Sequence, residues 1–251
     1  MLRSIKGLIG YNVLAKDGKI GHVEDFYFND EHWIIRYLIV DIGIWIFGRK
    51  VLISPDFFIK EPDWINNTFP INLTKDQVKN SPDISTDKPV SRQKEDEIAK
   101  YYSLPVYWSA GNPAIFPYAI PIETSERDVK DSKKEEEKEE GDSHLRSTNE
   151  LKGYNIKAED GEVGHVEDFI VDDISWKIKY IVVDIKKVFH GKKVIIDLNW
   201  IKDVSWANTR IHVDHKIEEI KNSPDYDPAE PVNRKYEEIL YDYYGRPRYW
   251  E

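Results

Sequence analysis

The alternation of apolar and polar residues predicts short β-strands over roughly the first 75 residues of each half of the chain. Asp17-Gly18 and Asp160-Gly161 each stand between two alternating stretches, which is a strong signal for a β-hairpin. Aromatic and β-branched residues predict the other strands, which in the first half are expected at 20–28, 33–42, 49–53 and 64–72. Several short strands at this spacing favour a small β-barrel over a parallel α/β sheet.

Helical periodicity follows the strands in each half. Residues 74–80 and 216–222 predict a helix of about two turns that ends at Ser-Pro-Asp. A longer helix is then predicted by residues at i, i+3 and i+7, namely Glu95, Ile98 and Tyr102 in the first half and Glu237, Leu240 and Tyr244 in the second. Each of these helices should end near a proline, Pro105 or Pro247, and each is followed by a Tyr-Trp pair.

The two halves are copies of each other. Residues 21–26, Gly-His-Val-Glu-Asp-Phe, recur unchanged at 164–169, an offset of 143, and Leu2-Arg3-Ser4 recurs at the same offset as Leu145-Arg146-Ser147. Past about residue 58 the offset becomes 142, so that Lys-Asn-Ser-Pro-Asp at 79–83 recurs at 221–225. The chain is therefore a tandem repeat.

The repeats predict two domains and a linker. We expect the first domain at 1–108, a Pro-rich and then charged flexible linker at 109–144, and the second domain at 145–251. Residues 123–142 hold ten acidic and five basic side chains and almost no apolar ones, so they bury too little surface to offset the entropy of ordering.

Composition narrows the chemistry without naming a function. The chain has no cysteine, which excludes disulfides, zinc–thiolate sites and a cysteine nucleophile. Its net charge of −10 makes a nucleic-acid partner a weak expectation, because such binding works by neutralising phosphate. The most apolar window, 33–47, contains Arg36 and Asp41 and is too short for a transmembrane segment. We therefore expect a soluble, cytoplasmic protein without a cofactor.

Several of these motifs together resemble the PRC-barrel family. They are the Gly-Tyr-Asn start, the Asp-Gly turn, the stretch at 18–26, the Trp-x-Ile-x-Tyr pattern at 33–41 and 176–184, and the Gly-Arg/Lys-Lys-Val strand at 48–51 and 191–194. The family is named for the cytoplasmic domain of the photosynthetic reaction centre H subunit and includes the ribosome-maturation factor RimM. The resemblance implies a mainly β fold, two tandem small PRC-type β-barrels that are each followed by short helices, and a role in protein interaction.

The repeated His-Glu-Asp set is the first candidate interaction surface, with His22, Glu24 and Asp25 in one copy and His165, Glu167 and Asp168 in the other. Because residues i and i+2 share a face of a strand, the His and Glu side chains can converge on a metal or a proton. Only two ligands converge in this way, so no metal site and no catalytic residues are predicted, and solvated strand residues are the favoured interpretation.

Basic pairs and aromatic tails complete the candidate surfaces. Arg49-Lys50, Lys186-Lys187 and Lys192-Lys193 are expected either to form a local positive patch or to be solvated charges beside a strand. The aromatic tails are expected to dock on their own barrel rather than on a partner. Their residues are Tyr101, Tyr102, Tyr107 and Trp108 in the first copy, and Tyr243, Tyr244, Tyr249 and Trp250 in the second.

These observations favour a non-enzymatic scaffold. The duplicated matches concentrate in glycines, apolar residues and aromatics, which indicates a protein-interaction module whose barrels pair with each other, within or between chains, or bind an unidentified protein partner. Alternatives left open are an RNA-processing or ribosome-associated factor of RimM type and a soluble protein similar to the H subunit.

Overall fold

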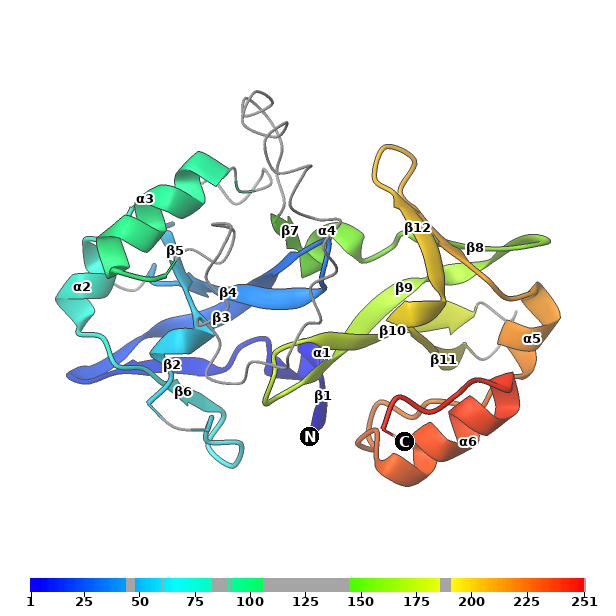
Figure 1. Ribbon diagram of the computed structural model, residues 1–251. Helices are drawn as coiled ribbons and strands as arrows, with labels where there is room; N and C mark the ends of the chain where they lie inside the picture. The colour runs from blue at the N-terminus through cyan, green and yellow to red at the C-terminus, as the bar shows by residue number, and fades with distance from the viewer. Residues whose placement is uncertain are drawn as a thin grey trace, which may run out of the picture. The chain divides into compact units, whose positions relative to one another are not determined.

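Strands form where alternating residues place one face in a core, and the computed structural model has them in both repeats (Figure 1). The structure describes residues 1–43, 48–59, 61–82, 90, 92–105, 145–185 and 191–250. The chain is mainly β, as predicted, with one bent sheet in each of two compact units. Unit 1 comprises Met1–Gly10, His32–Arg36 and Ser147–Glu251, whereas unit 2 comprises Tyr11–Glu31 and Tyr37–Arg146.

Unit 1 contains the larger sheet. Its strands run in the order β11 (Lys192–Asp197), β10 (Ile178–Ile185), β9 (Gly161–Asp172), β8 (Asn155–Ala158), β13 (Arg210–Val213) and β12 (Ile201–Ser205), and β1 (Leu2–Ser4) pairs with β9. Its helices are α1 (Ile5–Leu8), α4 (Thr148–Leu151), η2 (Leu198–Trp200), α5 (Ile217–Asn222) and α6 (Arg234–Tyr244). In Figure 1, β1 and α1 (dark blue) lie against β9 (yellow-green).

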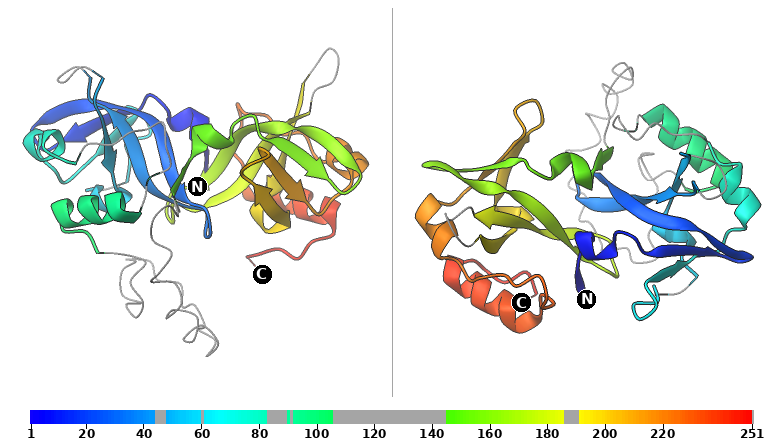
Figure 2. Two further views of the ribbon diagram at one scale, coloured as in Figure 1. Left: turned by 90° about the horizontal axis from the view of Figure 1, so that it is seen from above. Right: turned by 180° about the vertical axis from the view of Figure 1, so that it is seen from behind.

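Unit 2 repeats this pattern with fewer strands. Its sheet order is β5 (Lys50–Ile53), β4 (Ile34–Asp41), β3 (Gly18–Asn29), β2 (Asn12–Ala15) and β6 (Thr68–Pro70), and β7 (Leu145–Ser147) pairs with β3. Its helices are η1 (Pro55–Phe57), α2 (Lys75–Lys79) and α3 (Arg92–Tyr102). The predicted hairpins and the helices that follow them are thus confirmed, and Figure 2 shows the twist of β3 (blue) and β9 (yellow-green).

One predicted strand is shorter than expected. The pattern predicts a strand over 64–72, but β6 begins only at Thr68. Residues 64–67 form a tight turn, because the side chain of Asp63 accepts hydrogen bonds from the backbone N–H groups of Ile65 (3.2 Å) and Asn66 (3.0 Å). Asn67 takes a left-handed conformation (φ 53°), which asparagine tolerates better than most residues.

The core of each unit, although built mainly from one repeat, also contains apolar residues of the other repeat. In unit 2, Leu145 is fully buried in a cluster with Tyr27, Tyr37, Ile39 and Ile98. In unit 1, Ile5 and Leu8 of the first repeat are buried. Burial of such a side chain contributes roughly 1.5–3 kcal/mol, so the exchanged segments hold a substantial part of each core.

Among the described helices, none has the length and apolar character that a membrane span requires.

Candidate functional site

The Gly-His-Val-Glu-Asp-Phe motif occupies the middle of the longest strand of each sheet, β3 or β9. Its glycine is required by close packing, because a Cβ atom at Gly164 would lie 2.3 Å from the carbonyl oxygen of Asp184. The register with β10 shifts between Val166 and Asp168, so Glu167 is the extra residue of a β-bulge. Bulges redirect side chains, and this one places two carboxylates near the exchanged amino-terminal segment.

Asp168 is a buried acceptor for that segment. Its carboxylate accepts hydrogen bonds from the Ser4 hydroxyl, from the backbone N–H of Lys6 (2.9 Å) and from the backbone N–H of Phe169 (2.8 Å). Burial raises the pKa of Asp168 above its ordinary value, although these donors favour the ionised form. Asp168 therefore binds the start of α1 rather than facing solvent.

Glu167 is held between two lysines. Lys193 lies 2.7 Å and Lys6 3.2 Å from the same Oε1 atom. Burial disfavours the charged form of Glu167, but the hydrogen bonds from these lysines outweigh that effect and lower its pKa below the ordinary value. One of the two lysines comes from each repeat, so Glu167 also binds the exchanged segment.

The equivalent residues of unit 2 have a similar environment. Asp25 is buried and accepts a hydrogen bond from the backbone N–H of Phe26 (2.8 Å), while Glu24 forms an ion pair with Lys50 (2.7 Å). His22 and His165 are half-buried on their strands. Within the described ranges, no three His, Cys, Asp or Glu residues are grouped so that they can hold a metal ion.

The basic pairs contact other groups of their own unit. Arg49 donates to the carbonyl oxygen of Ser81 (2.6 Å), just past α2. Lys192 donates to the carbonyl oxygens of Lys221 (2.9 Å) and Ser223 at the end of α5. The helix dipole favours a cation at this end. With Lys50 and Lys193 paired to glutamates, the basic side chains at 49–50 and 192–193 all have a partner inside the fold, whereas Lys186 and Lys187 lie outside the described residues.

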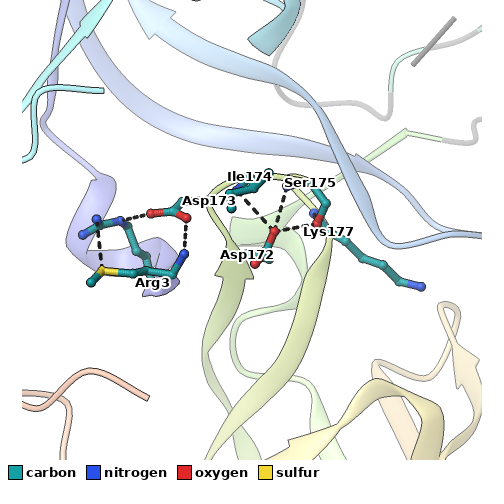
Figure 3. A network of polar contacts seen from close by, with 7 residues as sticks. Arg3, Asp172, Asp173, Ile174, Ser175 and Lys177 are labelled. Atoms are coloured by element: carbon teal, nitrogen blue, oxygen red, sulfur yellow. Dashed lines mark hydrogen bonds and ion pairs between the residues drawn. The ribbon is translucent and has the colours of Figure 1, made fainter. Parts of the chain in front are cut away.

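In each unit an ion pair joins the arginine of Leu-Arg-Ser in one repeat to the hairpin turn of the other, and Figure 3 shows the ion pair of unit 1. In unit 1, Arg3 Nε donates to Asp173 Oδ2 (2.7 Å). The turn is fixed by Asp172 Oδ1, which accepts from the backbone N–H groups of Ile174 (3.2 Å) and Ser175 (2.7 Å). In unit 2, Arg146 Nε lies 3.7 Å from Asp30 Oδ2. The offset of 143 relates the two ion pairs residue by residue.

The tips of two equivalent hairpins also meet within unit 1. Ile35 N–H donates to the Trp176 carbonyl oxygen and Ile178 N–H donates to the Trp33 carbonyl oxygen, both at 2.8 Å. Trp33 (φ 57°) and Trp176 (φ 56°) both take the left-handed conformation, which is a rare conformation for a bulky residue. The central pair of this antiparallel bridge is Ile34 and Lys177, again separated by 143.

The aromatic residues at the ends of α3 and α6 pack on their own units. Tyr101 and Tyr243 donate to the carbonyl oxygens of Gln77 and Glu219, both at 2.8 Å, and so tie the long helix to the preceding short one. Tyr102 lies against Phe57, and Tyr244 against Trp200, with ring centroids 5.0 and 4.7 Å apart. Burial raises the pKa of Tyr102 and of Tyr244 to about 12.

The end of the second aromatic tail contacts a buried glutamate of α6. Glu237 Oε1 accepts from Tyr180 Oη (2.6 Å) and Tyr249 Oη (2.8 Å), and Arg234 lies 3.0 Å from Oε2. Burial raises the pKa of Tyr249 to about 12. Trp250 packs on the Arg234 guanidinium, 4.0 Å from its ring centroid. Tyr107 and Trp108, the corresponding residues of the first repeat, lie outside the described residues, as does the linker at 109–144.

The sequence reasoning missed the residues that organise this site. Leu2-Arg3-Ser4 and Leu145-Arg146-Ser147 stand out in the sequence only as a repeat, but Ser4 caps α1 and Ser147 caps α4, and both segments contribute a strand and a buried leucine. The available signal was an N-cap serine preceded by an arginine and followed four residues later by a leucine, present twice.

Comparison with known protein families agrees with this architecture. A model of the PRC-barrel domain matches the chain twice, at residues 3–78 and 145–219. A search of curated proteins returned no match. The matched segments include the strand motifs and exclude α3 and α6, which carry the aromatic tails. Since together they cover more than half of the 251 residues, the chain belongs to the PRC-barrel domain family and carries two copies of the domain.

Proposed function

We propose that this protein is a non-enzymatic scaffold in which two PRC-barrel domains are paired within one chain as a pseudo-dimer. Two such domains indicate a binding or scaffold module. The pairing follows from an exchange, in which the first residues of each repeat serve as a strand and a short helix of the other repeat's unit. A partner protein would then meet two related surfaces presented by one chain.

The reciprocity of the contacts is the observation that carries the proposal. Arg3–Asp173 has its counterpart in Arg146–Asp30, and the bridge pair Ile34–Lys177 joins equivalent positions. In an isologous interface residue i contacts j while j contacts i, which is the pattern of a symmetric homodimer. A duplicated gene that retains such an interface yields a chain whose two halves pair with each other.

The candidate basic surface favours a protein partner over RNA. Arg49, Lys50, Lys192 and Lys193 each contact a carboxylate or a helix-end carbonyl, so RNA binding through them would compete with internal contacts. The net charge of −10 adds repulsion. Purified protein should accordingly show a protein-like 260/280 nm ratio and elute early from heparin.

The absence of native cysteine makes a direct test possible. Ile34 and Lys177 form a pair without mutual hydrogen bonds, whose Cα atoms in such geometry lie about 4.5 Å apart, within disulfide range. The variant Ile34→Cys/Lys177→Cys should oxidise to an intrachain disulfide, which is seen as faster migration on a non-reducing gel and as a linked peptide pair in mass spectrometry.

A matched control lies within one repeat. Asn155 and His165 form the same type of strand pair between β8 and β9, so Asn155→Cys/His165→Cys should oxidise whether or not the repeats exchange segments. Oxidation of the control without oxidation of the 34/177 variant would overturn the proposed pairing. So would a 34/177 disulfide found only in covalent dimers.

A further inference from the structure

The edge of β9 beyond the end of β8 receives the amino-terminal segment. β8 pairs with β9 at residues 161–165, and β1 pairs farther along at 170–172, with Leu2 opposite Asp172 and Ser4 opposite Ile170. Ile5 and Leu8 of the short helix that follows are buried. We call this surface of β9, with Glu167, Asp168 and Asp173, the segment groove.

Charge makes the segment groove selective. Three carboxylates, Glu167, Asp168 and Asp173, line it, and the segment 1–10 supplies Arg3 and Lys6. The equivalent segment of the second repeat has Asn149 in place of Lys6 and Glu150 in place of Gly7. It would therefore lose the ion pair to Glu167 and bring a negative charge to an acidic surface.

The segment ends at Gly10, the last residue of unit 1 before the chain enters unit 2. Tyr11 is the first residue of unit 2, and Gly10 has φ +85° with no atom within 4 Å of the position its Cβ would take. Every contact of residues 2–8 with the groove would be the same if the segment belonged to another chain. Only the effective concentration of the segment differs between the two cases.

We propose that a second copy of this chain supplies residues 2–8 to the segment groove, so that two chains form a segment-swapped dimer in addition to the monomer. This inference rests on the exchange in the proposed function and extends it from one chain to two. When each of two chains supplies its residues 2–8 to the segment groove of the other chain, the grooves of both chains are filled. The two chains then form a closed dimer rather than a filament.

Split cysteines test this proposal on the full-length chain. Leu2 and Asp172 are a pair without mutual hydrogen bonds, since Asp173 N–H donates to the Met1 carbonyl oxygen (2.9 Å) beside them. One tagged chain carries Leu2→Cys and a second, differently tagged chain carries Asp172→Cys. After co-refolding and oxidation, we expect a covalent heterodimer whose yield rises with chain concentration and falls when a synthetic peptide of residues 1–10 is added in excess.

Two controls separate the possible failures. Chains that carry Asn155→Cys and His165→Cys separately should give no heterodimer, because that hairpin belongs to a single repeat. A single chain with both Leu2→Cys and Asp172→Cys should form an intrachain disulfide. If this double variant oxidises but the split pair gives no more heterodimer than the hairpin control, the swapped dimer is wrong and the proposed function stands. If the double variant fails to oxidise while the 155/165 pair succeeds, the exchange itself is wrong.

Discussion

Three donors converge on the carboxylate of Asp168, and two of them, the Ser4 hydroxyl and the Lys6 N–H, belong to the other repeat. Such a buried acceptor matters for stability because removing it leaves buried donors without a hydrogen-bond partner. Without the carboxylate, the hydroxyl and the first turn of α1 would keep their donors in a water-poor site, and the desolvation of each would be uncompensated. The residue thus couples the docking of the segment to the stability of unit 1.

We expect Asp168→Ala to lower the free energy of unfolding by about 1–3 kcal/mol, the cost of an unsatisfied buried donor. His165→Ala on the same strand is the matched control, and as a half-buried polar residue it should change stability by only about 0.5 kcal/mol. Urea denaturation of both variants measures the difference. Equal stability of the two would mean that Asp168 does not hold the segment.

Glu237 is the corresponding residue for the aromatic tail. Two tyrosine hydroxyls donate to one oxygen and Arg234 contacts the other. Glu237→Gln keeps an acceptor for the tyrosines but turns an amide donor toward the guanidinium, so we expect a loss of about 2 kcal/mol.

Docking of the aromatic tail can be measured separately from stability. Proteolysis at Arg248, followed by mass spectrometry, should become faster in Glu237→Gln than in the control Glu238→Gln, which changes the neighbouring residue of the same helix. Unchanged proteolysis would show that the tail docks without Glu237.

At the scale of elements, the residue at the packing contact between β13, α5 and the end of α6 differs between the repeats. His215 is buried against the rings of Trp200 and Tyr244, with centroids 5.2 and 4.3 Å away. Asp214 (3.3 Å) and Glu219 (3.7 Å) face its ring nitrogens, and Arg246 forms an ion pair with Asp214. The first repeat has Leu73 at the equivalent position. Burial lowers the pKa of His215, although Asp214 opposes this effect.

The buried His215 predicts that stability depends on pH. The pKa of His215 is lower in the folded chain than the ordinary value near 6.5, so between the two values the unfolded state binds more protons. Stability therefore falls as the pH drops through about 6.5. In His215→Leu, which copies the first repeat, this contribution should disappear, so the melting temperatures at about pH 8 and pH 5.5 should differ less than in the wild type. An identical pH dependence in both proteins would contradict the assignment.

Local patterns predicted most elements correctly because the interactions that define them are local. The Asp17-Gly18 hairpin needs only turn residues and alternation, and α2 is preceded by the N-cap residue Thr74, whose side chain accepts from Gln77 N–H in a capping box. The turn after Asp63 was missed because Trp64 and Ile65 look like strand residues, whereas the side chain of Asp63 fixes the turn.

The sequence pattern names Glu167, Asp168 and the basic pairs as candidate residues, but it does not predict what they contact. The repeated His-Glu-Asp set and the basic pairs drew attention through their duplication, and the structure places Glu24 with Lys50 and Glu167 with Lys193. In unit 1, Glu167 and Asp168 also bind the exchanged segment. Because Leu-Arg-Ser begins both repeats, the sequence is compatible with docking in either unit, and pattern alone does not decide between them.

At the scale of the molecule, the exchange makes each unit depend on both repeats. Unit 1 contains the hairpin tip His32–Arg36, which connects β3 to the remainder of β4 in unit 2, and unit 2 buries Leu145, which lies just before α4 of unit 1. When one unit unfolds, segments docked on the other lose their anchoring and a larger entropy opposes their docking. The two units should therefore lose stability together.

Calorimetry of two equivalent core variants tests this coupling. Leu38 of β4 and Ile181 of β10 occupy the same position in the two repeats and are fully buried, so Leu38→Ala and Ile181→Ala should each cost about 2–5 kcal/mol. If segment exchange couples the units, each variant lowers the midpoint of one common transition, and the calorimetric and van't Hoff enthalpies remain equal. Independent units would instead give two transitions, with each variant lowering only one of them.

A disulfide tests whether the exchanged hairpin causes the coupling. In Ile181→Ala, the oxidised 34/177 disulfide keeps this hairpin in place and should raise the midpoint of the common transition. The 155/165 disulfide lies within one repeat and closes a much shorter loop, so it should stabilise the same variant less.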